Sequence, residues 1–367
     1  MILIATQTFA PIRGGMEIYM TSLAGKLAEA GLKVVVLADG SDKSFSPSEP
    51  YTLKRFGGWR PLRRWKKRFA VRALLAKGKI DGVFCDSWKS VESLPQKLPA
   101  PIVILAHGAE YPVAPSTRKQ RRIASALARS TAILANSKYT AELVRPFLSR
   151  PNDPRLKIVH PPISFLPDAS SAAQEEINRI IAERSPVISV VARLEARKGI
   201  DRVIAALPDV AAKHPSAFFL IGGSGGDKDR LAALAREKGV GDRVVFLGSL
   251  DNDMKAALLA ASDVFAMPVR RVGMSVEGFG ASYAEAGWFG VPSLGGKGSG
   301  AEDAVIDEKT GLLCDGENQT EVTAKLLRLL GDDNFRHTLG RAAEARTKAE
   351  LVWDVVLPRF LAAMEGR

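Results

Sequence analysis

The sequence is poor in cysteine and histidine, and its apolar residues form no long uninterrupted run. Its two cysteines, Cys85 and Cys314, cannot build a disulfide framework, which is typical of proteins in a reducing compartment. The four histidines lie far apart without metal-ligand spacing, so we expect no metal cofactor. No window approaches about 18 uncharged apolar residues, and the start lacks a basic signal region. We therefore expect a soluble cytoplasmic protein.

The length of 367 residues exceeds the usual size of one hydrophobic core, which predicts two domains. Short apolar runs alternate with segments of helical periodicity, a pattern typical of parallel sheets covered by helices on both faces. The predicted strands are Met1–Thr6, Val34–Ala38, Gly82–Cys85, Ile102–Ala106, Thr131–Ala135, Val187–Val191, Ala217–Ile221, Val244–Leu247 and Val264–Met267.

A proline-containing and then polar stretch interrupts this alternation between Val159 and Glu176. We interpret it as the connection between an N-terminal domain, 1–165, and a C-terminal domain, 166–345. The predicted fold class is α/β, with two Rossmann-like doubly wound domains and a crevice between them. In such sheets ligands bind at the carboxyl ends of the strands.

The net charge of +12 is divided unevenly along the chain. Residues 1–160 contain 27 Lys and Arg against 11 Asp and Glu, whereas the remainder contains 25 against 29. The basic character therefore belongs to the first half, and the second half is slightly acidic.

Two segments could bind a diphosphate. Gly14 and Gly15 lie between a predicted strand and helix, where backbone N–H groups can bind an anion, although a simple tight turn explains them equally. Arg193 and Lys198, in V-A-R-L-E-A-R-K-G, follow the strand Val187–Val191 and offer two cations, unless they form only a solvated loop.

The segment E-G-F-G-A-S-Y-A-E carries two carboxylates, Glu277 and Glu285, on either side of a glycine-containing turn that opens a helix. Each carboxylate can accept hydrogen bonds from two hydroxyl groups, so one suits a sugar and the other a ribose. The neighbouring Phe279 and alanines indicate a packed environment rather than two surface glutamates.

Together these segments resemble glycosyltransferase family 4, a retaining family of the GT-B fold. The resemblance extends over nearly the whole chain and includes G-G-M-E, H-G-A-E at 107–110, A-N-S-K-Y-T-A-E-L and K-T-G-L-L-C. The stretch M-P-V-R-R-V-G-M-S-V-E-G-F-G is similar to the phosphatidylinositol-mannoside mannosyltransferase subgroup. We also expect a C-terminal helix, 346–367, to return to the N-terminal domain.

The resemblance also implies roles. Arg193 and Lys198 match the pair that binds the diphosphate, and Glu277 the acidic residue beside the donor sugar. Phe279 and Gly280 would offer backbone amides to that sugar, and Glu285 would hold the ribose. His107 would reach the sugar from the N-terminal domain, and Gly14 and Gly15 would form the loop over donor and acceptor. The catalytic set is thus His107, Glu277, Arg193 and Lys198, and no metal is implied.

Two motifs suggest other chemistry. G-G-S-G-G at 222–226 fits a hydrolase nucleophile elbow around Ser224, but only His337 follows it, so a Rossmann turn is favoured. D-N-D at 251–253 mimics a metal-binding D-x-D, but the helical pattern that follows favours an N-cap.

From Pro50 to Ile80 there is no acidic residue, and cations at 54–79 interleave with Trp59, Trp65 and Phe69; a second basic cluster covers 118–122. Such a surface could bind nucleic acid or an anionic membrane, or could simply be solvated. Given the resemblance, the membrane is favoured over nucleic acid.

The sequence thus predicts a retaining hexosyltransferase, peripheral at the inner face of the membrane. Its donor would be GDP-mannose or a UDP-hexose, and its acceptor lipid-linked or membrane-associated, in envelope glycolipid or polysaccharide biosynthesis. The alternatives are a nucleotide-sugar 2-epimerase of the same fold and a non-enzymatic nucleic-acid-binding protein.

Overall fold

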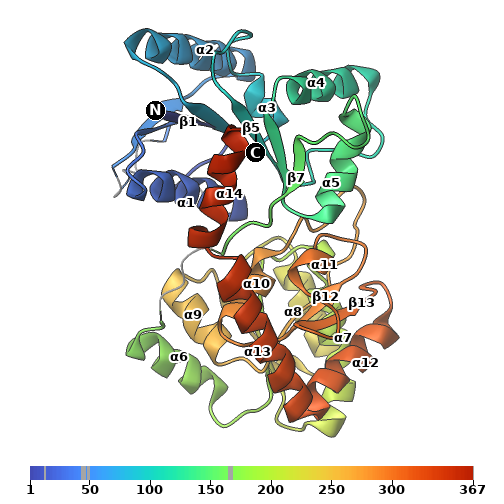
Figure 1. Ribbon diagram of the computed structural model, residues 1–367. Helices are drawn as coiled ribbons and strands as arrows, with labels where there is room; N and C mark the ends of the chain where they lie inside the picture. Colours follow the sequence, from blue (N-terminus) through green and yellow to red (C-terminus); the bar gives the residue numbers. More distant parts are fainter. Residues whose placement is uncertain (12–13, 43–46, 48–49, 164–167, 367) are drawn as a thin grey trace. The chain divides into compact units, whose positions relative to one another are not determined.

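The structure is a computed structural model that describes residues 1–11, 14–42, 47, 50–163 and 168–366. The chain divides into two compact units, Met1–Ser164 with Trp353–Arg367 and Phe165–Val352, and each is described by itself (Figure 1). The predicted boundary between 165 and 166 falls within 164–167, outside the described residues.

The first unit contains, in its described part, a sheet of seven parallel strands in the order β3-β2-β1-β4-β5-β6-β7. Its strands are β1 (Ile2–Thr6), β2 (Val34–Asp39), β3 (Thr52–Phe56), β4 (Gly82–Cys85), β5 (Ile102–Ala106), β6 (Ala132–Ala135) and β7 (Leu156–Ile158). Its helices are α1 (Gly15–Glu29), α2 (Arg60–Lys77), α3 (Trp88–Val91), α4 (Thr117–Ala128), α5 (Lys138–Val144), the 3-10 turn η1 (Arg145–Phe147) and α14 (Trp353–Met364).

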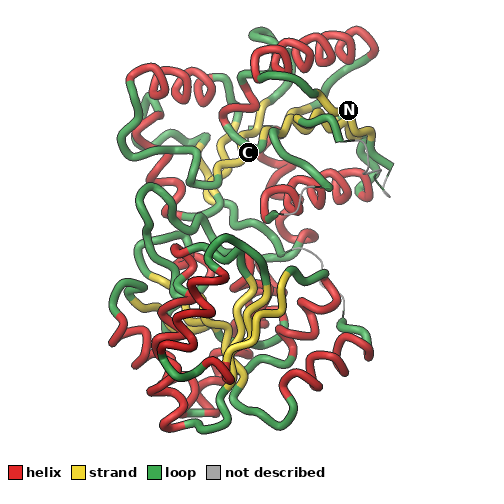
Figure 2. The backbone as a smooth tube through the Cα atoms, turned by 180° about the vertical axis from the view of Figure 1, so that it is seen from behind, coloured by secondary structure: helices red, strands yellow, loops and turns green. Residues whose placement is uncertain are grey.

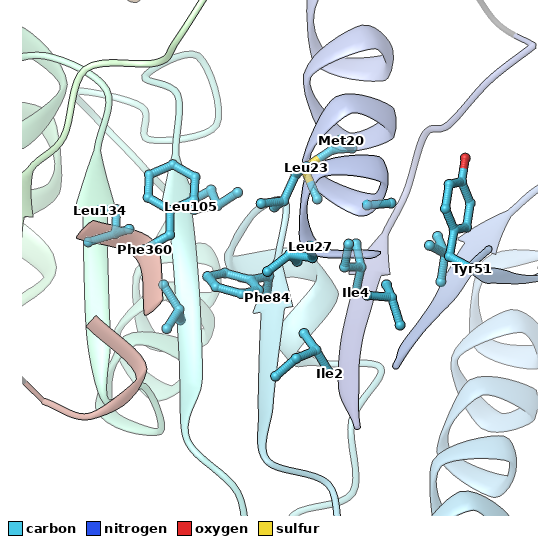
Figure 3. Packing of buried hydrophobic residues seen from close by; sticks show 14 of the residues in the cluster. Ile2, Ile4, Met20, Leu23, Leu27, Tyr51, Phe84, Leu105, Leu134 and Phe360 are labelled. Atoms are coloured by element: carbon cyan, nitrogen blue, oxygen red, sulfur yellow. The ribbon is translucent and has the colours of Figure 1, made fainter. Parts of the chain in front are cut away.

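Both faces of this sheet are covered because side chains alternate along each strand. Ile2 and Ile4 of β1 pack against α1 and α14 (Figure 3). Leu3 and Ala5 point to the opposite face, where α2, α3 and α4 contribute the apolar side chains. The order of the strands reverses direction between β1 and β4, which makes the carboxyl ends of these strands a switch point.

The second unit contains, among its described residues, a sheet of six parallel strands in the order β10-β9-β8-β11-β12-β13 (Figure 2). Its strands are β8 (Val187–Val191), β9 (Phe218–Gly222), β10 (Val244–Gly248), β11 (Val264–Met267), β12 (Ser293–Gly296) and β13 (Gly311–Cys314). Its helices are α6 (Ser171–Ile181), α7 (Ile200–Lys213), α8 (Lys228–Glu237), α9 (Asn252–Ala260), α10 (Ala281–Trp288), α11 (Ala301–Ala304), α12 (Gln319–Gly331) and α13 (Asp333–Glu350), with 3-10 turns η2 (Ala196–Lys198) and η3 (Gly241–Arg243).

The predicted fold of two doubly wound α/β sheets is therefore confirmed. The C-terminal segment requires a correction, because the predicted returning helix 346–367 is two helices. Residues 346–350 belong to α13, whose buried Ala343 and Thr347 pack beside α10 in the second unit. Only α14 returns to the first unit, because Phe360 and Val356 are buried in its core.

In the described part of the chain, every helix is too short or too polar to cross a membrane.

Candidate active site

Glu277 forms the centre of a buried ionic cluster in the second unit. It lies in the loop that follows β11, and its Oε2 accepts hydrogen bonds from Lys198 Nζ at 2.5 Å and Arg197 Nη1 at 2.8 Å. The side chains of Glu277, Arg197 and Lys198 are only 13, 12 and 10% exposed. The loops after β8 and β11, which are adjacent strands, bring these residues together.

Charge balance keeps Glu277 ionised. Burial by itself raises the pKa of this carboxyl, but Lys198 and Arg197 outweigh that effect and leave the pKa below its usual range. Glu195 also pairs with Arg197 and with Arg193, so the group of three cations and two carboxylates carries one excess positive charge. Such fixed cations can stabilise negative charge that develops on a bound diphosphate.

Arg197 is the residue of this cluster that the sequence analysis missed. The predicted partner of Lys198, Arg193, is 69% exposed and instead pairs with Glu195 at 3.1 Å. Arg197 is held by both Glu195, at 2.9 Å, and Glu277. Its place beside Lys198 in A-R-K was the only available signal, because the 3-10 turn that aims both cations at Glu277 has no clear sequence pattern.

The predicted turn before α10 is also present. Gly280 has a φ of +85°, and an added Cβ would lie 2.5 Å from the Tyr283 ring, so both backbone and space require glycine. Phe279 is buried at 2% exposure. The backbone N–H of Gly300 donates to the Glu277 carbonyl at 2.9 Å, so the glycine-rich run after β12 packs directly on this turn.

Glu285 lies inside α10 and is buried as predicted, but it has a partner that the sequence analysis did not identify. Its Oε1 accepts a hydrogen bond from Lys255 Nζ of α9 at 2.8 Å. Lys255 lies on the buried face of α9 with Leu258 and Leu259, at i, i+3 and i+4. A lysine on the apolar face of a helix indicates a buried acidic partner, and this pattern could have identified Lys255 from the sequence.

In the first unit, His107 follows β5, and its Nε2 atom is buried without a hydrogen-bond partner among the described residues. Burial lowers the pKa of this imidazole to about 4, so it is neutral at pH 7. The Tyr19 ring packs edge-on against it, with the centroids 5.7 Å apart. The backbone N–H of His107 donates to Glu110 Oε1 at 2.8 Å, which fixes the loop.

Gly14 and Gly15 open α1, where Gly14 is the N-cap in an extended conformation. The Glu17 carboxylate lies over Gly14, since an added Cβ there would fall 2.4 Å from Glu17 Oε2. Glu17 also accepts a hydrogen bond from the Thr8 hydroxyl. This end of the helix therefore already has an acidic side chain beside it, which suits a hydroxyl ligand better than a second anion.

The structure supports the simpler interpretations of the two competing motifs. Asp251 caps α9 by accepting from Met254 N at 2.9 Å, and Asp253 binds Ser170. The Ser249 hydroxyl donates to Ser224 Oγ at 3.0 Å, and a Cβ on Gly223 would lie 1.9 Å from the Ala192 carbonyl. The glycines thus allow close packing of the loops after β8 and β9.

Comparison with known proteins identifies the family of the chain. The profile of Glycosyltransferase Family 4 matches residues 13–164, and that of Glycosyl transferases group 1 matches residues 173–346. A GDP-mannose-dependent alpha-(1-6)-phosphatidylinositol monomannoside mannosyltransferase of Mycobacterium tuberculosis is 28% identical over 100% of this chain and 98% of its own length.

A second relative is a GDP-mannose-dependent monoacylated alpha-(1-6)-phosphatidylinositol monomannoside mannosyltransferase of Corynebacterium glutamicum. It is 37% identical over 53% of this chain and 50% of that protein. Among solved structures, a sucrose-phosphate synthase of Thermosynechococcus elongatus superposes with a TM-score of 0.79, at 23% identity over 99% of this chain and 98% of that one. Two consecutive profile matches on two doubly wound units show that the chain belongs to glycosyltransferase family 4 and is a hexosyltransferase of the GT-B fold.

Proposed function

We propose that this enzyme transfers a hexose from a nucleotide diphosphate donor, GDP-mannose or a UDP-hexose, to a lipid-linked or membrane-associated acceptor with retention of configuration. The observation that carries the proposal is the buried cluster in which Arg197 and Lys198 converge on Glu277. The names of the mycobacterial and corynebacterial relatives support a GDP-mannose donor and a phosphatidylinositol-based acceptor.

The cluster suits departure of a diphosphate. As the glycosidic C–O bond breaks, negative charge grows on the diphosphate oxygen, and cations that are already in place stabilise this charge more than the ground state. Arg197 and Lys198 are held by hydrogen bonds before the donor arrives, and exposed Arg193 can add a third charge. Glu277, which stays ionised, can accept hydrogen bonds from sugar hydroxyls.

Retention follows if the acceptor hydroxyl attacks the face from which the diphosphate departs. The departing diphosphate oxygen then accepts the hydroxyl proton, so no covalent sugar–enzyme bond is needed. This step rests on family membership. We propose that His107 contacts the donor sugar. Its buried Nε2 atom supports this role, because an unpaired buried polar atom is destabilising and a hydrogen bond to a sugar hydroxyl would remove that cost.

We also propose that transfer needs no metal ion. Arg197 and Lys198 already supply positive charge of the kind that a divalent cation would provide. The aspartates of D-N-D have other partners, since Asp251 caps α9 and Asp253 binds Ser170.

We place the enzyme at the inner face of the membrane, in the cytoplasm, with its acceptor in an envelope glycolipid or polysaccharide pathway. The support is an exposed aromatic pair on α2: Trp65 and Phe69 are 62 and 64% exposed, and their rings stack at 6.2 Å. Lys66 and Arg72 are exposed on the same helix. Aromatic side chains beside cations favour the interface of an anionic bilayer.

The structure changes which cations can take part. Lys67 is buried and bound to Asp39 at 2.6 Å, so it cannot contact lipid. Arg68 donates to the Glu92 carbonyl at 2.7 Å, and Arg55 to the carbonyl of Ala10. We therefore restrict the proposed membrane surface to the exposed residues of 54–79 and 118–122.

The proposed function is tested by incubating the enzyme with donor and membrane extract, with and without EDTA. We expect NMR to show a product with retained anomeric configuration, and EDTA to leave the rate unchanged. Glu277→Ala should lower the rate at least a hundredfold, which corresponds to an increase of about 3 kcal/mol in the activation free energy. An inverted product or loss of activity with EDTA would contradict the proposed mechanism. Conversion of the donor sugar to its 2-epimer would instead identify an epimerase.

A further inference from the structure

A pocket of about 260 Å³ lies in the first unit at the carboxyl ends of its strands. Its wall includes Gln7, directly after β1, Asp39 at the end of β2, and Trp88 and Ser90 in the helix after β4. It therefore occupies the switch point of this sheet, which is where doubly wound domains bind ligands. The volume is below the range of about 300–1,000 Å³ for drug-sized ligands, so the pocket suits a small group rather than a whole nucleotide sugar.

The wall of this pocket is strongly cationic. Helix α2 contributes Arg60, Arg63, Arg64 and Lys67, whose spacing of i, i+3, i+4 and i+7 places them on one helix face. Helix α3 adds Lys89, and α4 adds Lys119 and Arg122. Asp39 is the one carboxylate in the described wall. The aromatic pair Trp65 and Phe69 lies off this face, at positions that are exposed.

Internal ion pairs neutralise only part of this charge. Lys67 and Arg63 share Asp39, at 2.6 and 3.6 Å. Arg64 and Arg122 share the Glu92 carboxylate, at 2.6 and 2.8 Å.

Three cations of the wall remain available. Arg60, Lys89 and Lys119 form no ion pair with any residue that the structure describes. Lys89 lies 5.9 Å from the centre of the Trp88 ring, which holds its ammonium group at the wall.

We propose that this pocket binds an acceptor group that carries two or more negative charges, namely a phosphomonoester or a diphosphate. Calling the ligand an acceptor rests on the proposed function, whereas the binding chemistry does not. Forked guanidinium groups and ammonium groups are the usual ligands of phosphate. A single phosphodiester charge would leave most of the three unmatched cations without a partner, whereas a diphosphate would engage them all.

Binding is measured by calorimetry on the full chain with inorganic pyrophosphate and with inorganic phosphate. The pocket variant is Arg60→Gln, Lys89→Gln, Lys119→Gln. The matched control, Lys66→Gln, Arg72→Gln, Lys77→Gln, removes the same charge from exposed positions of α2. We expect pyrophosphate to bind more tightly than phosphate, and the pocket variant to weaken pyrophosphate at least tenfold while the control changes it less than twofold.

Binding of the donor's nucleoside diphosphate serves as an internal control, and we expect both variants to retain it. Thermal unfolding checks the fold, which should be preserved because the three replaced cations have no ion pair to lose. Equal weakening by both variants would show only general electrostatic attraction and would overturn the proposal, as would no weakening by the pocket variant. This arm needs no turnover, so it is independent of the proposed function.

A second arm separates the sources of the phosphate. Detergent-solubilised polyprenyl diphosphate and a soluble sugar phosphate are compared as competitors of pyrophosphate, with phosphatidylglycerol as the monoanionic control. Competition by the polyprenyl diphosphate identifies a lipid-linked acceptor, and competition by the sugar phosphate alone a soluble one. Equal competition by phosphatidylglycerol would overturn the preference for two charges.

Discussion

At the residue scale, Arg197 links the two carboxylates of the cluster, Glu195 and Glu277. Both Arg197 and Lys198 bind the same carboxylate oxygen, and Glu195 holds Arg197 from its other side. Removing either cation leaves a buried carboxylate with half of its charge compensation, which is more costly than losing an exposed ion pair.

We predict that Arg197→Gln lowers the turnover of donor ten- to a hundredfold. A charge-assisted hydrogen bond contributes about 1.5–3 kcal/mol, and the leaving group also loses one cation. The measurement is kcat and KM for the donor. Arg236→Gln, which removes an exposed arginine from α8, is the matched control and should behave as wild type. Wild-type turnover in Arg197→Gln would mean that this arginine only supports the loop.

A second residue-scale prediction concerns Glu110. Burial raises the pKa of this carboxyl to about 7, although the His107 N–H bound to it acts in the opposite direction. The folded chain then holds the Glu110 proton more tightly than the unfolded chain, so stability is lost as pH rises from about 4.5 through 7. Glu110→Gln removes this loss, and should gain stability relative to wild type between pH 5 and pH 8, by about 1–3 kcal/mol.

The measurement is denaturant unfolding followed by tryptophan fluorescence. Of the five tryptophans, Trp88 lies at this loop, because its indole N–H donates to the Glu110 backbone carbonyl at 3.2 Å. His107, whose pKa is lowered to about 4, has the opposite linkage but is common to both proteins and cancels. A difference in stability that does not vary with pH would contradict the raised pKa of Glu110.

At the scale of elements, α2 combines two surfaces. Lys67 and Arg64 belong to the face that lines the pocket, whereas Trp65 and Phe69 are exposed. We predict that Trp65→Ser with Phe69→Ser lowers binding to phosphatidylglycerol vesicles at least tenfold and removes the part that survives high salt, because only the apolar contribution is insensitive to screening.

Co-sedimentation at low and high salt is the measurement. Met274→Ser, which removes an exposed apolar side chain from the second unit, is the control and should bind as wild type. Lys66→Glu with Arg72→Glu should weaken the salt-sensitive part instead, since each cation near the surface contributes about 1 kcal/mol. Equal sedimentation of all variants, or equal binding to neutral vesicles, would mean that α2 does not dock on lipid.

The sequence predicted elements well where apolar runs were clear, and poorly where they were short or polar. Strands β4, β5, β8 and β11 lie where expected, but β3, T-L-K-R-F, alternates with charged residues and was not identified. The composition of 54–79 suggested one basic surface, although α2 distributes its cations between a pocket and solvent.

The candidate site shows the same division between chemistry and geometry. The residue types around Glu277 could be predicted from the sequence because they match the motif of the family. Arg197 and Lys255 were missed because their roles depend on a 3-10 turn and on contact between α9 and α10, respectively.

At the scale of the whole molecule, α14 packs in the first unit although the whole second unit precedes it in the sequence. Helix α14 adds Phe360, which is fully buried, to the core formed by α1 and the first sheet (Figure 3). The Phe360 ring lies 6.1 Å from Phe84 of β4 and 6.2 Å from Trp353. The first unit therefore cannot complete its core until α14 has been synthesised.

We predict that Phe360→Ala destabilises the first unit by about 3–5 kcal/mol, the usual cost of removing a buried phenyl ring, and leaves the second unit unchanged. Hydrogen exchange followed by mass spectrometry measures each unit separately, since β1 and β4 report on the first and β8 on the second. Leu326→Ala, which opens a cavity under α12 in the second unit, is the matched control and should reverse the pattern. Faster exchange in both units with Phe360→Ala would show that they unfold as one cooperative body, so that α14 would stabilise the whole chain rather than the first core alone.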